Sequence, residues 1–492
     1  IADTNVLTPR KNDFVNGLIG VLTSVKTIQA TYTKNSGTVL PGYTPGVGFF
    51  GTSKPTIGFV FGSQADVRYE AARNGWLTLY PDFNQNYTQV SNEIFKSTVN
   101  IDLLPDLKID LSLDRAYSEN FSEQYDISNG NYNSRSPYNY GMFAISTILI
   151  KTSFSTSDEN SSAAFDDFRS NRLPIANRLA TEKGIDLSNP ANIDAEGYPK
   201  GFGKNNQAVL LPAFLAAYSG ESASSTSLGI FKSFPVPNWS IKYNGLMRFD
   251  FFKKNFKRFS LQQNYIASYS ISAFRSNFEY DKNPNGVDIS GNYYNKTIMS
   301  NVNLVERFNP LIRMDFELKN SLKILTEIKK DRALSMSFDN NLLTEVKGIE
   351  YVVGMGYRIK DVVISSKLAD NPTGIIKSDI IIKADFSYRN NKTIVRYLDY
   401  DNNQLAGGQD IWTLKLTADY EKNKKDALII NIAGKQRMLT QNISKNIFYL
   451  YNNKNTSFLE LDSSTIEFIY NLSSLKKGNS LTGITKAPTD EI

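Results

Sequence analysis

The stretch NIDLLPDLKIDLSLD, Asn100 to Asp114, decides how this chain is interpreted. Its apolar residues recur at every second position with polar or charged residues between them: Ile101, Leu103, Leu107, Ile109, Leu111 and Leu113. A period of two is typical of a β-strand with one apolar face. Pro105 and Asp106 interrupt the pattern and supply turn geometry. The stretch therefore predicts two antiparallel strands joined by a tight turn.

The same alternation recurs through most of residues 1–420 and predicts an all-β fold. It continues through Phe259 to Tyr280 and through Leu311 to Lys329, far beyond the about 5 or 6 residues usual in soluble sheets. Such strands fit a wall that crosses a bilayer, with an apolar face toward lipid and an ionic face toward a wet lumen. Met314 and Phe316 are then expected to face lipid, and Asp315 the lumen. A large soluble solenoid or sandwich is the alternative, because its strands alternate in the same way.

Composition excludes several classes of function. The chain of 492 residues contains no cysteine and no histidine, which rules out thiol nucleophiles, histidine-based triads and His/Cys zinc sites. We predict no enzymatic activity, no cofactor and no metal site. The net charge of +6 is spread through strands and loops, and this pattern predicts no nucleic-acid partner. No apolar run reaches the ~18 residues that a spanning helix requires.

Two regions depart from the alternation. Residues from about 155 to 225 show apolar residues at helical spacing and include AVLLPAFLAAYSG, Ala208 to Gly220, which predicts a helical insertion. Val39 to Pro55 is rich in Gly and Pro and predicts irregular chain. Within the strands, tight turns are predicted at RFNPL, Arg307 to Leu311, and at RNNK, Arg389 to Lys392, because Asn and Pro favour turn geometry.

Five segments carry a family resemblance that extends over about residues 1–420, loops included. They are SRSPYNYGMFAISTILIKTSF (Ser134 to Phe154), GYPKGFGKNNQAVLLPAFLAAYSG (Gly197 to Gly220), PNWSIKYNGLMRF (Pro237 to Phe249), the run from Ser300 to Gly348, and SYRNNKTIVRYLDYDNNQLAGGQDIWTLKLTADY (Ser387 to Tyr420). These segments resemble the C-terminal part of the SprA/Sov family, the outer-membrane translocons of the Bacteroidetes type 9 secretion system.

The resemblance implies an incomplete part of a very large antiparallel transmembrane β-barrel with a helical loop insertion. We expect residues 1–422 to form this barrel segment in the outer membrane of a Gram-negative, Bacteroidetes-like bacterium. The implied function is protein conduction for type 9 secretion and gliding motility. The implied partners are outer-membrane lipid, secreted cargo proteins, and plug and accessory subunits. The chain opens IADTNV with no signal peptide, so we interpret it as an internal piece of something longer.

After Tyr420 the pattern changes to helical spacing. One helical stripe contains Leu428, Ile432, Leu439, Ile443, Ile447 and Leu450, and a second stretch, SFLELDSSTIEFIYNLSSLKKG, follows it. We therefore expect residues 423–492 to form a short α-helical C-terminal segment.

The run NIAGKQRMLTQNISK, Asn431 to Lys445, resembles the N-terminal sensor domain of type IV pilus chemotaxis transducers, the PilJ-like domain. By that resemblance Arg437 is the candidate for binding a ligand anion, because its guanidinium offers paired donors. The residues expected to shape the helix around it are Asn431, Gly434, Gln436, Met438 and Gln441. A sensor module carried by the tail is thus the alternative function. An amphipathic helix whose Arg437 faces water, and a chimeric reading frame, are the other interpretations of the tail.

Overall fold

The structure is a computed structural model that describes residues 24–46, 48, 57–60, 65–80, 83–104, 106–365, 375–400, 403–422, 439–441, 443, 463–470 and 473. These residues divide into two compact units. The first unit holds the described residues up to Leu318, together with Ile324–Val353 and Phe386–Thr413. The second unit holds Lys319–Lys323, Gly354–Asp385 and the described residues from Leu414 onward.

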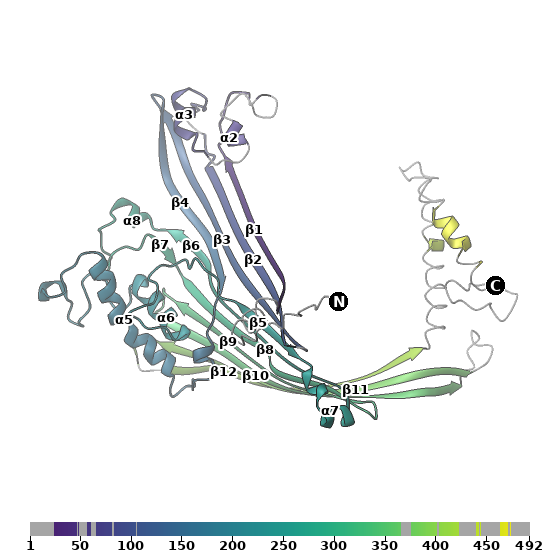
Figure 1. The fold of residues 1–492 in the computed structure, drawn as a ribbon. Coiled ribbons are helices and arrows are strands. Elements are labelled where there is room, and N and C mark those ends of the chain that lie inside the picture. Colours follow the sequence, from purple (N-terminus) through teal and green to yellow (C-terminus); the bar gives the residue numbers. More distant parts are fainter. Residues whose placement is uncertain are drawn as a thin grey trace, which may run out of the picture. The chain divides into compact units, whose positions relative to one another are not determined.

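The strands form a 12-stranded sheet in the order β1-β2-β3-β4-β6-β8-β9-β10-β11-β12, with β5 paired to β3 and β6, and β7 paired to β6 (Figure 1). Neighbouring strands from β1 to β8 are antiparallel. The prediction of a mainly antiparallel β fold is therefore confirmed. The strands are β1 (Val25–Val39), β2 (Tyr87–Leu104), β3 (Leu107–Ser128), β4 (Asn131–Ser146), β5 (Asn238–Tyr243), β6 (Phe256–Ser276), β7 (Thr297–Met299), β8 (Asn301–Leu318), β9 (Leu322–Ser337), β10 (Leu342–Ser365), β11 (Ile375–Tyr397) and β12 (Asn403–Lys422).

Helices connect or cover the strands. They are α2 (Ile57–Val60), α3 (Arg68–Arg73), α4 (Ile150–Ser153), α5 (Ala163–Glu182), η2 (Pro190–Asn192), α6 (Gln207–Ser219), η3 (Gly245–Arg248), α7 (Asp250–Asn255) and α8 (Phe278–Lys282). Within the described part of the chain, none of the helices has the length and apolar character to cross a membrane.

The hairpin predicted from Asn100 to Asp114 is confirmed. Ile101 pairs with Ile109 and Leu104 with Leu107, so the apolar side chains of β2 and β3 share one face. Asp106 adopts a positive φ of 70°, a conformation that Asp tolerates better than most residues.

The prediction of one strand from Leu311 to Lys329 is wrong. The chain turns between β8, which ends at Leu318, and β9, which begins at Leu322. Ser321 has a φ of 70°, as expected for the left-handed residue of a short hairpin loop. Three residues separate the strands, so even-numbered positions stay on one face through the turn, and the alternation continues across it. Similarly, the predicted strand from Phe259 to Tyr280 ends at Ser276, where α8 follows.

The predicted turns at RFNPL and RNNK are also wrong, because both segments lie inside strands, β8 and β11. Pro310 cannot donate a ladder hydrogen bond, and it lies where the pairing of β8 with β6 is irregular, between Gln262 and Tyr265. In RNNK the polar residues serve side-chain contacts across the sheet: Arg389 pairs with Asp331 at 2.7 Å.

The helical insertion interrupts a single strand position. β4 pairs with β3 and β6 up to Ser146, and β5 returns from Asn238 to the same place between β3 and β6. At the break, the amide of Val236 donates to the carbonyl of Ser146 at 3.0 Å. Ala267 of β6 also keeps its hydrogen bonds, since its N–H donates to Asn238 Oδ1 at 2.8 Å and its carbonyl accepts from Thr147 N at 3.0 Å. The insertion therefore leaves no backbone group of Ala267 unsatisfied.

The main core lies between this insertion and one face of the sheet, with α5 and α6 beside each other (Figure 1). α6 is buried on nearly every side, as expected of a helix that is apolar all round. Asn206 caps its start by accepting from the amide of Ala208 at 2.8 Å, and Gly220 ends it in the left-handed conformation, with a φ of 67°. The sheet contributes Phe143, Ile145, Tyr265, Tyr269, Ile271, Val302, Leu304, Phe308, Leu334 and Met336, and Leu398 joins them from just after β11.

Candidate functional site

In the first unit, one face of the sheet is covered by protein in one part and exposed in another. Phe308 is buried under the insertion and pairs with Tyr265, while Met314 pairs with Leu261. The pairing of β6 with β5 is unbroken from Leu261 to Tyr265, so Leu261 and Tyr265 share a face. Met314 and Phe308 therefore share that face too. Even-numbered residues of β8 thus begin under the helices and continue beyond them.

Beyond the insertion, this face carries exposed apolar side chains. They range from 40% exposed at Ile312 to 66% at Trp412, with Tyr351, Val353 and Phe386 between these values. Aromatic rings on this face contact one another: the buried Phe259 stacks on the half-buried Phe316 with centroids 5.4 Å apart, and the half-buried Tyr388 lies 4.4 Å from the exposed Trp412. Ile312 and Trp412 are therefore not sealed in a core.

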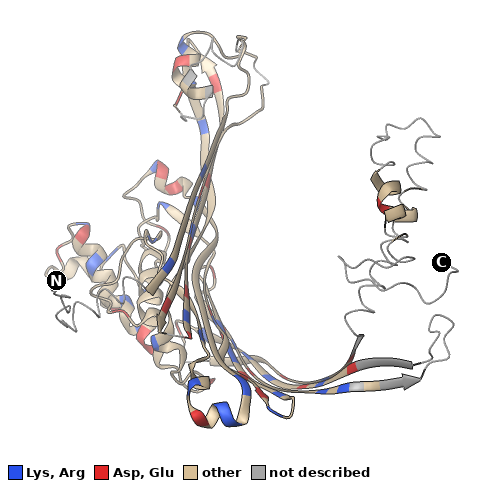
Figure 2. Ribbon diagram, turned by 45° about the vertical axis from the view of Figure 1, so that its right-hand side comes forward, with Lys and Arg blue, Asp and Glu red and all other residues tan. Residues whose placement is uncertain are grey.

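The opposite face of the same strands carries ion pairs. Arg258 lies 2.9 Å from Asp315, Lys257 3.3 Å from Glu317, and Lys329 3.6 Å from Glu350. Figure 2 shows basic and acidic residues beside one another along the strands. Exposed pairs of this kind stabilise a protein by about 1 kcal/mol or less. Their importance here is their location, because they separate an ionic face from an apolar one.

The second unit shows the same division by itself. On β10 the exposed apolar residues Met355, Tyr357 and Ile359 alternate with Gly356 and Arg358. Ion pairs join Arg358 to Asp379 at 3.5 Å and Lys383 to Asp419 at 2.6 Å.

Two buried ion pairs fasten the insertion to the sheet. In the first, Arg332 of β9 lies 3.0 Å from Glu306 of β8. Glu306 also accepts hydrogen bonds from the hydroxyls of Tyr265, at 2.7 Å, and Ser153. Arg332 donates to the carbonyl of Thr152 at 3.1 Å. Because Thr152 and Ser153 belong to α4, this network joins the start of the insertion to the sheet.

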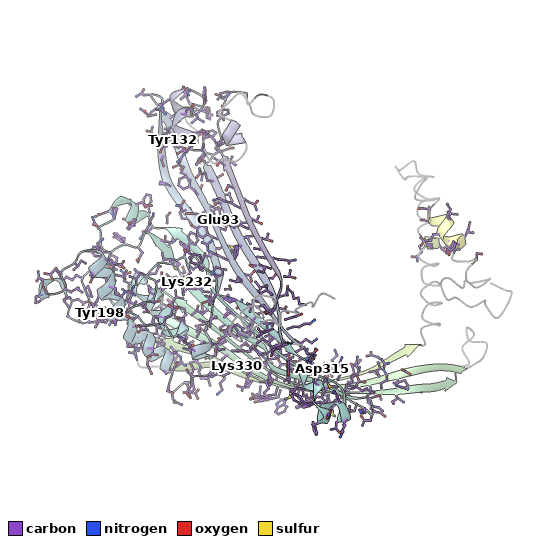
Figure 3. The ribbon with its side chains drawn as sticks, viewed as in Figure 1. Glu93, Tyr132, Tyr198, Lys232, Asp315 and Lys330 are labelled. Carbon is purple, nitrogen blue, oxygen red and sulfur yellow. The ribbon has the colours of Figure 1, made fainter. Side chains whose placement is uncertain are left out.

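In the second pair, Arg396 of β11 lies 3.0 Å from Glu345 of β10. The two side chains are 0% and 1% exposed. Ser157, in the insertion, donates to Glu345 at 2.6 Å and accepts from Arg396 at 2.9 Å. Nearby, burial raises the pKa of the Tyr218 phenol on α6. Lys330 adds a contact from the sheet, to the carbonyl of Ser153 (Figure 3). Alternation alone gave no sign of these pairs, whose members lie far apart in the sequence.

A second, smaller hydrophobic core lies near α3, where Figure 3 labels Tyr132. Arg68 lies over the ring of Tyr87, 4.6 Å from its centroid. It also pairs with Asp66 at 2.8 Å and with the buried Glu123. The hydrogen bonds from Arg68 hold the pKa of Asp66 below its ordinary value. We assign this cluster a structural role, because its charges satisfy one another.

Most of the anion-binding residues expected in the tail, Asn431, Gly434, Gln436, Arg437 and Met438, lie outside the described residues. Gln441 is described, and it is helical and exposed. Leu439, from the expected apolar stripe, is buried. Residues 463–470 are helical. Among the described residues there is no group of three or more acidic side chains that could hold a metal ion.

Residues 420–492 match the family model described as the type IV pili methyl-accepting chemotaxis transducer N-terminal domain, PilJ. The tail is therefore similar to that family, as its sequence predicted. No curated protein matches the chain.

Proposed function

We propose that the sheet forms part of the wall of a transmembrane β-barrel in the outer membrane. Strand length supports this proposal. With 21 residues at about 3.3 Å each, β6 extends about 70 Å, well beyond an apolar band of ~25 Å. A wall that crosses the bilayer and projects beyond it needs strands of this length.

The observation that carries the proposal is the division between the two faces. Phe316, Tyr351 and Trp412 lie on one face, and the pairs of Arg258 with Asp315 and Lys329 with Glu350 lie on the other. Exposed aromatic side chains in mutual contact cost free energy in water, whereas lipid would solvate them. Charged pairs tolerate a hydrated lumen. A soluble sheet would instead need a further layer of protein over Trp412 and its neighbours.

The transport role rests on the sequence resemblance. Under the proposal, the chain contributes to a protein-conducting translocon of type 9 secretion and gliding motility, without catalytic chemistry. Its partners are outer-membrane lipid, secreted cargo proteins, and plug and accessory subunits. The ionic face would line the conduit, and the insertion would lie outside the apolar band, since its polar loops suit water rather than hydrocarbon.

Cysteine scanning tests the orientation of the wall directly, because the chain has no native cysteine. Single variants Phe316→Cys and Glu317→Cys, with Tyr351→Cys and Glu350→Cys as a second pair, would carry an environment-sensitive fluorophore in lipid vesicles. We expect lipid-borne quenchers to act on positions 316 and 351, and aqueous quenchers on 317 and 350. Equal quenching at both members of each pair, or a chain that stays in solution without detergent, would refute the proposal.

A second function is favoured by the family match at residues 420–492. A PilJ-like tail would bind a small anion through Arg437. Isothermal titration of the full chain with nitrate should release heat that Arg437→Ala abolishes, while Lys435→Ala, a neighbouring loss of charge, should retain it. Absence of heat with nitrate and with related small anions would count against the sensor. Transcript reads that end at Tyr420 would identify the tail as a chimera.

A further inference from the structure

A row of lysines crosses β9, β10 and β11 at the edge of the helical insertion, and its members are Lys330, Lys347 and Lys392. We call these residues the lysine row. Lys330, labelled in Figure 3, donates to the carbonyl of Ser153 and therefore faces the insertion. The other two lysines are an even number of residues away from Glu345 and Arg396, which contact Ser157 of the insertion. Because side chains two residues apart share a face of a strand, the whole row lies on the apolar face.

The lysines of β10 and β11 lie opposite each other. Toward one end of this strand pair, Leu398 N donates to the carbonyl of Asn341 at 3.1 Å. Toward the other end, Arg389 lies 3.5 Å from Glu350. Counted from either contact along the antiparallel strands, the two lysines come to the same position. Like charges that are directly opposite destabilise a sheet, so these charges do not serve to hold the strands together.

The lysine row lacks a carboxylate partner within the described part of the chain. None of its three ammonium groups has a described carboxylate within ion-pair distance. The carboxylates near the row have other partners: Glu345 pairs with Arg396, Asp410 accepts hydrogen bonds from Tyr388 and Asn390, and Asp158 accepts from the amides of Asn160 and Ser161. Cations that lie together concentrate anions, and phosphate oxygens accept charge-assisted hydrogen bonds from them.

Aromatic side chains lie beside the lysine row. The ammonium of Lys330 is 4.3 Å from the ring centroid of Phe154, which is exposed. On β10, the exposed Tyr351 comes four residues after the lysine, and on β11 the half-buried Tyr388, which contacts Trp412, comes four residues before it. Aromatic side chains beside cations are typical of the membrane–water interface, where rings lie at the headgroup level and cations attract anionic lipids. An acidic soluble peptide would explain the cations but not the exposed rings.

Positions along β10 give the depth of the lysine row in the proposed wall. Glu345 is buried beneath the insertion, and Val353 is exposed on the apolar face. Lys347 comes two residues after the first and six before the second, or about 7 Å and about 20 Å along a strand. The polar layer on each side of the hydrocarbon core of a bilayer is about 5–8 Å thick. The row therefore lies at the level of that layer, between the insertion in water and the apolar face in hydrocarbon.

We propose that the lysine row binds the phosphate of an anionic membrane lipid, whose acyl chains lie along the apolar face beside Tyr351. The inference rests on the proposed wall and adds a ligand to its lipid-facing side. Lys347 and Lys392 supply the principal contacts, because Lys330 already donates to the carbonyl of Ser153. Their replacement leaves no carboxylate without its partner, which makes them suitable for substitution.

The test uses the full chain in a neutral detergent and a short-chain lipid that dissolves as monomers, so binding does not depend on insertion into a bilayer. Dihexanoyl-phosphatidylglycerol is titrated calorimetrically, with dihexanoyl-phosphatidylcholine as the zwitterionic comparison. The double variant Lys347→Gln/Lys392→Gln removes two cations of the row. The matched control is Lys108→Gln/Lys242→Gln, because these two lysines also lie opposite each other, on β3 and β5, but on the ionic face.

We expect saturable binding of phosphatidylglycerol that weakens about 30-fold in the double variant, because each lysine near an anionic headgroup contributes about a 5-fold factor. The control variant should bind within about 2-fold of the unsubstituted chain. Lys347→Arg/Lys392→Arg keeps both charges and should also retain binding, which separates a loss of charge from a loss of fold. Equal binding of phosphatidylcholine, or an equal loss in the control or arginine variant, would overturn the inference.

Competition identifies the source of the phosphate. Displacement of the lipid by equimolar inorganic phosphate would assign the lysine row to a free anion, and displacement by an equimolar oligoglutamate peptide would assign it to a protein partner. Either result would overturn the lipid assignment. A chain that shows the expected quenching pattern in vesicles but no preference for phosphatidylglycerol would refute this inference alone and leave the proposed wall intact.

Discussion

Replacement of Arg396 by methionine should loosen the helical insertion from the sheet. Arg396 is fully buried, and its guanidinium contacts Glu345 at 3.0 Å and Ser157 at 2.9 Å. Without it, the carboxylate of Glu345 keeps only the hydroxyl of Ser157, at 2.6 Å. A buried carboxylate that loses its partner destabilises a protein by about 3–5 kcal/mol.

Removal of both charges should not destabilise the protein in this way. Glu345→Leu/Arg396→Met leaves no unpaired charge, and such replacements are often neutral or stabilising by about 1–4 kcal/mol. The existing pair is imperfect, since Glu345 Oε1 and Arg396 Nη1 have no hydrogen-bond partner in the structure. We therefore expect the double variant to be at least as stable as the unsubstituted chain.

Native-state trypsin digestion measures the effect, because α5 carries Arg169, Arg172 and Arg178. Cleavage there follows the population in which the insertion has opened. A change of about 3–5 kcal/mol corresponds to a roughly 150- to 4000-fold increase in that population. The control is Arg389→Met, also on β11, whose half-buried side chain pairs with Asp331 and Glu350. Because water still reaches these pairs, the loss should be much smaller than that for the fully buried Arg396. Equal cleavage of the two single variants, or a double variant as labile as Arg396→Met, would refute the reasoning.

Three further predictions concern other parts of the sheet. Gly141→Ala should lower the urea midpoint by an amount equivalent to about 1–3 kcal/mol, because a Cβ there would lie 2.0 Å from the carbonyl oxygen of Ser118. The control is Gly37→Ala, which should change the midpoint little because there is open space around Gly37. Asp66 has a pKa below its ordinary value of 3.8 because Arg68 donates hydrogen bonds to it, so its contribution to stability is present above about pH 4 and lost as the pH falls through the lowered pKa. Asp66→Asn should therefore flatten the loss of stability on acidification, and an unchanged slope in urea titrations from pH 5 to pH 2 would contradict this. Val353→Lys, on the apolar face, should reduce vesicle insertion by about 2–4 kcal/mol if the residue lies near the midplane, and the neighbouring Val352→Lys should reduce it less; equal losses in a flotation assay would argue against the assignment of faces.

The alternation of apolar and polar residues predicts a turn correctly where the turn residues interrupt it. The hairpin of β2 and β3 could be predicted because Pro105 and Asp106 break the apolar period between Leu104 and Leu107. The turn at Lys319 to Ser321 could not, since an odd number of loop residues preserves the period. Asn309 and Pro310 led to the opposite error, a turn predicted inside a strand. Both residues favour turns, yet an irregularity in the pairing of β6 with β8 accommodates them within β8.

Long-range pairing explains what the sequence could not indicate about the sites. The ionic and apolar faces follow from a period of two, so Arg313 to Phe316 already showed them. Arg396, in contrast, finds Glu345 and Ser157 only because β10, β11 and the insertion meet in space. The helical insertion between Ser146 and Asn238 was predicted and is confirmed, but the sequence does not indicate that the two strands flanking it occupy one position in the sheet. Only the register against β3 and β6 identifies them as one position.

That broken position has an architectural consequence. Arg115 pairs with Ile145 and Ser112 with Asn238 on the neighbouring strand, so the excursion departs and rejoins within the space of two or three ladder rungs. The helical insertion is therefore a replaceable unit. A related chain without it could continue the strand from Ser146 into Asn238 and keep its pairing with β3 and β6, so a different insertion could occupy this position without a change in the sheet.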